Sequence, residues 1–160
     1  MPFDIKPATP ADVNSILSMI RELAEFEHLT HLCTASEEQL TDELFGTGSV
    51  AEALIARDGN EPVGYAIFFH NLSTFLGRRG LYLEDIYVRP AFRHRGCGRA
   101  LLIAVARIAH ERKCARFEWM ALDWNTNAIE FYEKLGAKQL PEWRLLRMTG
   151  DSIEKLARLT

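Results

Sequence analysis

The sequence predicts an α/β (α+β) fold in which hairpin strands and inserted helices build one mixed sheet. Three observations predict it: an amphipathic helix near the N-terminus, two strand-like runs joined by turn formers, and a strand that leads through a basic loop into a further helix. At 160 residues the chain can bury a continuous core without disulfides or metals. We therefore expect residues 1–160 to form a single domain.

Helix starts are well marked in the first half of the chain. Thr9, Pro10 and Asp12 supply an N-cap hydroxyl, a proline at the first helical position and an early carboxylate. Ser36 and Gln39 repeat the capping pattern, and the turn formers between Asp58 and Pro62 separate two strand-like runs. These signals predict a strand over 3–7, helices over 10–26 and 37–45, and hairpin strands over 51–57 and 63–71.

The second half of the chain is predicted to repeat the order strand, loop, helix. Apolar residues at helical spacing follow Gly96, and Asn125 and Gly136 are suited to begin and end another helix. We expect strands over 81–88, 115–122 and 143–148, helices over 96–113, 126–135 and 151–159, and a polar connection over 89–95.

Composition argues against several classes of function. No apolar run approaches the ~20 residues of a membrane span, and residues 1–6 have no basic region followed by an apolar stretch. We therefore expect a cytoplasmic protein with no membrane role. The formal net charge of −3 argues against a nucleic-acid partner. Cys33, Cys97 and Cys114 are too far apart for a zinc site and are expected to be reduced thiols, and the five histidines show no metal-ligand spacing.

The segment from Val88 to Ala100 has the chemistry of an anion site. It runs from a predicted strand through a basic turn into a predicted helix, whose first N–H groups have no internal partner. Gly96 and Gly98 allow a phosphate to approach the backbone closely. Positive charge around the turn comes from Arg89, Arg93, Arg95 and Arg99.

Other interpretations of this loop are weaker. A P-loop requires Gly-Lys-Ser or Gly-Lys-Thr at the helix start, which is absent, and a dinucleotide fingerprint requires a small residue where Leu101 stands. A solvated basic turn that caps a core helix remains an alternative. A further alternative is a reactive thiol, because Cys97 at a helix start can have a lowered pKa.

The loop resembles the acetyl-coenzyme A motif of the GNAT superfamily of N-acetyltransferases. Arg93 to Gly98 matches the pattern Arg/Gln-x-x-Gly-x-Gly/Ala, after a strand and at a helix start. The chain is most similar to the diamine (spermidine/spermine) and thialysine N-acetyltransferase branch. That likeness rests on Lys6-Pro7-Ala8-Thr9, Glu22-Leu23-Ala24-Glu25-Phe26-Glu27, Leu81-Tyr82-Leu83-Glu84-Asp85, Asp123-Trp124-Asn125 and Phe131-Tyr132.

The resemblance implies a fold and a cofactor. The expected fold is a mixed, mostly antiparallel sheet of six to seven strands with about four helices. Its fourth and fifth strands, 81–88 and 115–122, would be splayed around the thioester. The implied co-substrate is acetyl-CoA, without a metal, and the implied cofactor-binding residues are Ile86, Tyr87, Val88, Arg93, His94, Arg95, Gly96, Cys97, Gly98, Arg99, Asn125, Asn127 and Tyr132.

The resemblance also implies two catalytic residues. Acetyl transfer needs a base for the amine proton and a proton for the departing thiolate. Glu84 matches the family's base, acting through water, and Tyr132 matches its tyrosine acid, since a phenol stays neutral at physiological pH. A half-exposed strand carboxylate and a core aromatic on the stripe of Ala128 and Leu135 are the structural alternatives for these two residues.

The acceptor is expected to be a small cationic amine, because carboxylates are in excess in the segments that the resemblance assigns to the acceptor side. The implied substrate-binding residues are Phe26, Glu27, Glu84, Asp85, Glu118, Trp119 and Met120. The sequence departs from the family in the short connection before Trp143 and at 118–120, which leaves polyamine specificity open. Similarity to the branch implies a homodimer. Acetylation of a protein N-terminus or lysine, and a non-catalytic acetyl-CoA sensor, are the alternatives.

Overall fold

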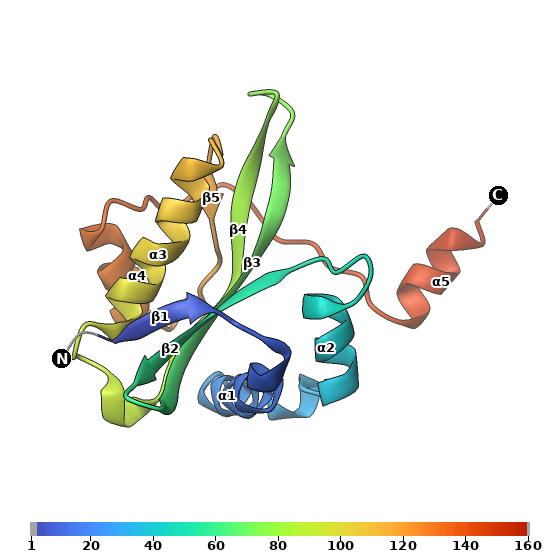
Figure 1. The fold of residues 1–160 in the computed structure, drawn as a ribbon. Helices are drawn as coiled ribbons and strands as arrows, with labels where there is room; N and C mark the ends of the chain where they lie inside the picture. Colours follow the sequence, from blue (N-terminus) through green and yellow to red (C-terminus); the bar gives the residue numbers. More distant parts are fainter. Residues whose placement is uncertain (1–2, 160) are drawn as a thin grey trace. The chain divides into compact units, whose positions relative to one another are not determined.

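The chain divides into two compact units, residues 1–120 and 121–160. The computed structural model describes residues 3–159. The first unit contains the sheet and three α-helices, and the second contains two α-helices (Figure 1). A single domain over the whole chain stays a prediction.

The first unit is built on a five-stranded mixed sheet in the order β1-β2-β3-β4-β5. The first four strands pair antiparallel, and β4 pairs parallel with β5. This arrangement confirms the mostly antiparallel sheet and the hairpin predicted from the turn formers. The strands are β1 (Asp4–Pro7), β2 (Glu52–Asp58), β3 (Glu61–Ser73), β4 (Arg78–Val88) and β5 (Phe117–Glu118).

Helices cover both faces of this sheet. Buried Ile16 and Met19 of α1 (Val13–Phe26) and Leu44 of α2 (Glu37–Phe45) form one core cluster with Tyr65 of β3. Gly64 precedes Tyr65 in β3, so it faces the opposite side of the sheet. On that side Leu101 of α3 (Cys97–Glu111) lies close to Gly64. The early strand, the two early helices and the helix after the basic loop are therefore confirmed (Figure 1).

Both predicted helix starts are confirmed, with one difference. At α2 the Gln39 N–H donates to Ser36 Oγ at 3.2 Å, and the Ser36 N–H donates to Gln39 Oε1 at 3.0 Å, as a capping box requires. Before α1, Thr9 and Pro10 open a short 3-10 turn, Pro10–Asp12. There the N–H and hydroxyl of Thr9 donate to buried Asp12, which also forms an ion pair with Arg57.

The second unit contains α4 (Thr126–Lys134) and α5 (Asp151–Ala157). Both helices were predicted. Asn125 is the N-cap of α4 and accepts a hydrogen bond from the Ala128 N–H at 3.4 Å, while Gly136 lies just past the end of the helix at φ 100°.

The expectation about the number of strands was wrong. The described chain has five strands rather than six to seven, while its five α-helices agree with the helices predicted by range. Residues 143–148 form no strand, and the strand expected over 115–122 is reduced to Phe117–Glu118. A strand persists only where a neighbour takes its backbone N–H and C=O groups, and in the described chain these segments have no such neighbour outside the β4–β5 pair.

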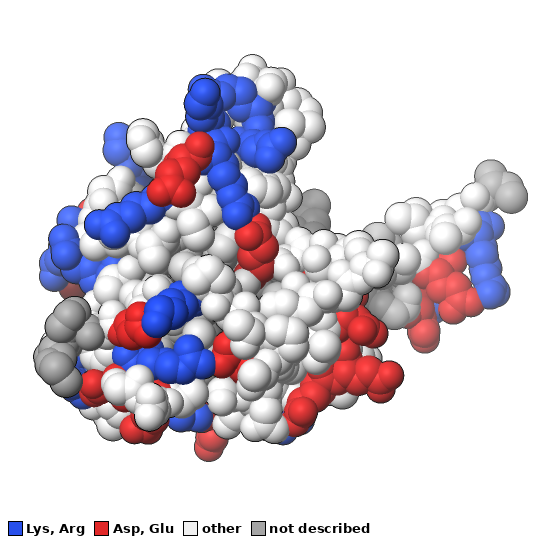
Figure 2. All heavy atoms as spheres, in the orientation of Figure 1, with Lys and Arg blue, Asp and Glu red and all other residues white. Residues whose placement is uncertain are grey.

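Charge is distributed unevenly over the first unit. Figure 2 shows acidic side chains gathered over α2, which carries Glu37, Glu38, Asp42 and Glu43, and basic side chains towards the outer end of the β3–β4 hairpin, where Arg78 and Arg79 lie. Within residues 3–159 no helix combines the length and apolarity that crossing a membrane demands.

Candidate active site

The basic loop leads into the first turn of α3, where the backbone N–H groups have no partner within the helix. A 3-10 turn, Pro90–Phe92, follows β4, and Gly96 then adopts a left-handed conformation with φ 89°. The first hydrogen bond into the helix runs from the Ala100 N–H to the Gly96 carbonyl, at 2.9 Å. The N–H groups of the three residues before Ala100 lie in the first turn and have no carbonyl in the helix to bind. This end of α3 can therefore bind an anion.

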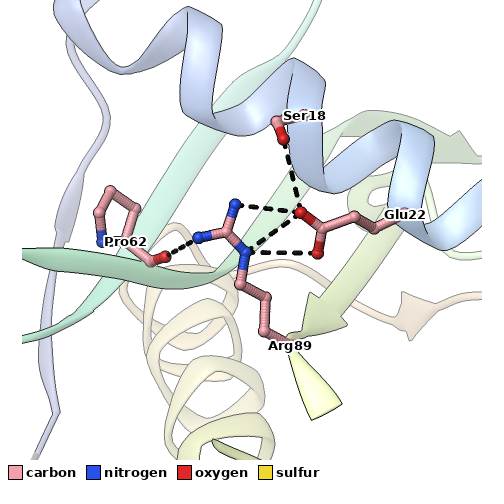
Figure 3. A network of polar contacts seen from close by, with 4 residues as sticks. All are labelled: Ser18, Glu22, Pro62 and Arg89. Atoms are coloured by element: carbon pink, nitrogen blue, oxygen red, sulfur yellow. Dashed lines mark hydrogen bonds and ion pairs between the residues drawn. The ribbon is translucent and has the colours of Figure 1, made fainter. Parts of the chain in front are cut away.

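Arg89 does not belong to this anion site, contrary to the sequence-based expectation. Its guanidinium donates to both carboxylate oxygens of Glu22 on α1, at 3.0–3.3 Å, and to the Pro62 carbonyl at 2.9 Å (Figure 3). The Ser18 hydroxyl donates to the same carboxylate at 3.4 Å. Arg89 thus ties the end of β4 to α1 and to the start of β3, and its charge is neutralised there.

The other loop arginines differ in how many contacts they make within the protein. Arg93 donates through Nε to the Val88 carbonyl at 2.8 Å, and its guanidinium lies 5.1 Å from the ring centroid of Phe26 and 5.4 Å from that of Tyr87. Arg95 forms an ion pair with Asp58 at 2.9 Å. Arg99 is exposed in the first turn of α3, and His94 is exposed with φ 59°. Arg99 is therefore well placed to meet an anion at the helix start.

Cys97 is not an activated nucleophile. The side chain is 1% exposed, and burial raises the pKa of its thiol to about 11, against a smaller opposing effect of Arg95. Because the thiolate is the reactive form, the hypothesis of a lowered pKa at this helix start was wrong. Cys97 contributes its backbone to the loop and its side chain to the core.

The fourth and fifth strands diverge next to this loop, as the resemblance implied. Parallel pairing joins Leu81 to Phe117 and Tyr82 to Glu118 and then stops. From Leu83 onward, β4 pairs only with β3 among the described strands. No described strand therefore pairs with the other edge of β4 along the stretch that leads to α3.

Ile86 and Val88 turn their backbone polar groups to that open edge. The Arg89 N–H donates to the Val63 carbonyl at 2.9 Å, so Arg89 turns its backbone towards β3. Every second residue of a strand points its backbone groups to the same side, so the N–H and C=O of Tyr87 also point towards β3. The N–H and C=O of Ile86 and Val88 therefore point to the opposite edge of β4. An extended amide-bearing ligand could therefore pair with the N–H and C=O of Ile86 and with the Val88 N–H. The Val88 carbonyl already accepts a hydrogen bond from Arg93 Nε, and the Tyr87 backbone is used within the sheet.

Glu84 lies at a β-bulge on the same strand. Asp85 is paired with Ile67 and Leu83 with Phe68, so Glu84 is the extra residue that has no partner on β3. Its side chain is exposed. A carboxylate at this position can exchange protons with water, as a base acting through a water molecule requires.

Asp85 and Glu27 form an acidic cluster with a buried tyrosine. The Tyr65 hydroxyl donates to Asp85 Oδ2 at 3.3 Å, and Tyr65 is fully buried. Burial and the neighbouring charges of Glu84 and Glu27 raise the pKa of Asp85 to about 6. Burial likewise raises the pKa of Glu27, at the end of α1. Tyr65 was not identified from the sequence, where it is simply one apolar residue in a strand-like run.

The remaining residues expected at the acceptor are placed in the first unit as follows. Phe26, at the end of α1, lies under the Arg93 guanidinium. Glu118 on β5 is paired with Arg116 Nε at 2.6 Å and accepts from Asn71 at 3.3 Å, so its charge is already compensated. The Trp119 ring packs against Phe117 at 4.8 Å, and Met120 is exposed.

The second unit carries the three other predicted site residues. Tyr132 lies on α4, and its ring centroid is 5.4 Å from that of Phe131. Asn125 uses its side-chain oxygen to cap the helix, and Asn127 lies exposed in the first turn. Capping fixes where α4 begins and hence the helical phase at which Tyr132 projects.

A family model agrees with this fold and loop. The model of the acetyltransferase (GNAT) family matches residues 17–137, so the chain belongs to that family and is an N-acetyltransferase. It is 38% identical over 164 residues to a thialysine N-epsilon-acetyltransferase of Sus scrofa, covering 96% of each chain. It is 33% identical over 200 residues to an L-ornithine N5-acetyltransferase of Arabidopsis thaliana, covering 97% of this chain and 88% of the relative.

Solved structures share the architecture. An integron cassette protein from the mobile metagenome of V. cholerae superposes with a TM-score of 0.83 at 25% identity, covering 99% of both chains. A ribosomal-protein-alanine N-acetyltransferase from Brucella melitensis superposes with a TM-score of 0.69 at 23% identity, covering 92% of this chain and 100% of that one. These similarities support the GNAT fold and, at such identities, say nothing of the substrate.

Proposed function

We propose that this N-acetyltransferase transfers the acetyl group of acetyl-CoA to the primary amine of a small cationic acceptor, such as a polyamine, a diamine or a lysine-like amino acid. The observation that carries the proposal is the open edge of β4 beside the unpaired N–H groups of α3. An extended pantetheine arm suits the backbone groups of Ile86 and Val88, and a diphosphate suits the helix start with Arg99 nearby.

The residues proposed to bind acetyl-CoA match its chemical groups, in the order in which these groups follow one another along the cofactor. Amide N–H and C=O groups match the amides of pantetheine, and backbone N–H groups with arginines match phosphates. When bound, acetyl-CoA supplies the thioester carbonyl that the amine attacks. The protein's own task is then to orient that carbonyl, to accept a proton from the amine and to return one to the sulfur.

Glu84 and Tyr132 are proposed to carry the two proton transfers. Glu84, exposed on the bulge of β4, accepts the amine proton through a water molecule. The Tyr132 hydroxyl donates a proton to the departing thiolate. The acetyl group passes directly to the amine nitrogen, so no acetylated residue is formed. Both assignments rest on matching positions in the family motifs.

The acidic cluster supports a cationic acceptor. Asp85 and Glu27 are half-buried carboxylates, and the charge of Glu27 helps to raise the pKa of Asp85, an arrangement that a bound ammonium group relieves. Relatives named for thialysine and L-ornithine support a basic amino acid among the candidate acceptors.

A thiol-release assay with a panel of amines tests the proposal. Purified protein and acetyl-CoA are mixed with thialysine, ornithine, spermidine, putrescine or a peptide with a free N-terminus, and free coenzyme A is measured. We expect turnover with one or more of the small amines and none with the peptide. Turnover restricted to the peptide would favour a protein acetyltransferase, and saturable acetyl-CoA binding without any turnover would favour a sensor.

Replacing Glu84 by Gln tests the base. We expect kcat to fall about tenfold, below the usual ~10²-fold or more for general bases, because bulk water reaches this exposed position and takes over part of the role. Steady-state kinetics at saturating acetyl-CoA and amine measure this change. An unchanged kcat in Glu84→Gln would remove the assignment.

Arg89 and Arg99 are expected to give opposite results. Arg89→Gln loses the Glu22 ion pair and the bond to the Pro62 carbonyl, so the free energy of unfolding should fall by about 1 to 2 kcal/mol while coenzyme A affinity changes little. Arg99→Gln should leave stability unchanged and weaken coenzyme A binding by about tenfold. Urea unfolding and calorimetric titration measure the two effects, and weaker binding caused by Arg89→Gln alone would reverse the roles.

We also propose a homodimer, on the basis of the branch that the chain resembles. Sedimentation at working concentration tests this, since a monomer alone would contradict it.

A further inference from the structure

A single hydroxyl group links the sheet core to the acceptor side of the proposed site. Tyr65 has no exposed surface, and its hydroxyl donates to Asp85 Oδ2 at 3.3 Å. Asp85 is paired with Ile67 and Tyr87 with Tyr65, so the two side chains lie two residues apart on the same sheet face, on neighbouring strands. The phenol is therefore rigidly held by the core and brings one donor to a half-buried carboxylate.

The other titratable groups around Asp85 oppose its charge. Glu84 precedes it on β4, and Glu27 faces it from the end of α1, and both raise the pKa of its carboxyl in addition to burial. The Tyr65 hydroxyl is the group that acts in the opposite direction, because its hydrogen bond favours the anion. Arg93, on the loop after β4, lies over the rings of Phe26 and Tyr87.

We propose that Tyr65 is a positioning residue for the acceptor: its buried hydroxyl orients the Asp85 carboxylate and keeps it in the anionic form that binds the ammonium group. This inference rests on the proposed function. Without the Tyr65 hydroxyl, burial and the charges of Glu84 and Glu27 would raise the pKa of Asp85 with no opposing hydrogen bond. The carboxyl would then take up a proton at a higher pH. The acceptor would then lose its counter-charge in the neutral range.

The pH dependence follows from the sign of these effects. The pKa of Asp85 is raised to about 6, so the carboxylate is mostly ionised above that pH and is lost as pH falls through it. Acceptor affinity should therefore decline on the acid side of pH 6. Removing the Tyr65 hydroxyl moves this decline to higher pH, because the one contribution that lowers the pKa disappears.

Tyr65→Phe tests the proposal in steady-state kinetics. At pH 6.5 we expect KM for the amine to rise about threefold to tenfold, the factor that one hydrogen bond corresponds to, with KM for acetyl-CoA unchanged. At pH 8.5, where the carboxyl is ionised in both proteins, only the loss of orientation remains, so the difference should be clearly smaller than at pH 6.5. An equal rise at both pH values would point to a general packing defect and overturn the inference.

Asp85→Asn supplies the matched control, because an amide cannot ionise. In the Asp85→Asn background, Tyr65→Phe should leave the pH profile unchanged, which makes the effect of the two substitutions non-additive. Additive shifts in the double variant would show that Tyr65 acts elsewhere.

A titration by NMR separates this inference from the proposed function. The carboxyl carbon of Asp85 is assigned by its loss in Asp85→Asn and followed against pH in the wild type and in Tyr65→Phe, without any substrate. We expect its midpoint to move upward in Tyr65→Phe even if no amine in the panel is acetylated. Identical midpoints would refute the role of Tyr65, whatever the enzyme turns over.

Discussion

Replacing Tyr132 by Phe is expected to lower kcat by about 10² to 10⁴, the range found for a lost general acid. The substitution removes one oxygen and keeps the ring, so the packing of Phe131 against it on α4 is retained. The departing thiolate must then leave as an anion or take its proton from water, which raises the barrier of the chemical step alone. Thiol-release kinetics at saturating acetyl-CoA and amine measure this change.

Both KM values should stay close to those of the wild type in Tyr132→Phe, because the hydroxyl is proposed to act only as the thiolate forms. Tyr82→Phe is the matched control: it removes a hydroxyl from β4, at a position to which no proton transfer is assigned, and should keep its turnover. Full turnover by Tyr132→Phe would leave the tyrosine as a packing residue of α4.

A valine at Gly98 is expected to weaken coenzyme A binding by about 100-fold. Its side chain would stand over the unpaired N–H groups of the first turn of α3 and would prevent a phosphate from accepting one or two charge-assisted hydrogen bonds. Outside its own helix, the nearest neighbour of a Cβ at Gly98 is Val88 Cγ2, at 3.8 Å. The fold itself therefore has room for the added Cβ, and titration calorimetry with coenzyme A measures the loss.

Gly98→Ala is the control for this substitution. The family motif accepts alanine at this position, and alanine is the better helix former by about 0.5 to 1 kcal/mol, so binding should persist with slightly higher stability. Gly96 offers no such control, since its φ of 89° would strain any side chain there. Wild-type affinity in Gly98→Val would rule out the start of α3 as the phosphate site.

Local signals in the sequence predicted much of the fold. The capping box at Ser36 and Gln39, the turn formers before Pro62 and the cap at Asn125 each act within a few residues, and all three are present in the structure. The strand expected at 143–148 was wrong for the complementary reason. Its composition suits a strand, but pairing depends on a partner, and in the described chain the sheet supplies none.

The candidate site was predicted in outline through the motif around Gly96 and the resemblance that it supports. The roles of the individual loop arginines could not be predicted from the sequence, because charge alone did not distinguish Arg89 from Arg99. Only folding brings Glu22 of α1 to Arg89 and leaves Arg99 exposed at the helix start. The reactivity of Cys97 was likewise decided by burial, which no pattern around it reveals.

By itself the sequence determined the class of the enzyme, the order of most elements and the position of the basic loop before α3, because these depend on neighbours a few residues apart along the chain. The tertiary structure alone decided which polar groups are hydrogen-bonded within the protein and which can bind a ligand. It placed the Tyr65 hydroxyl against the Asp85 carboxylate and ended the pairing of β4 with β5 after Tyr82. A side chain's pKa and hydrogen-bonding capacity depend on the residues that surround it in space, and in this protein those come from distant strands and helices.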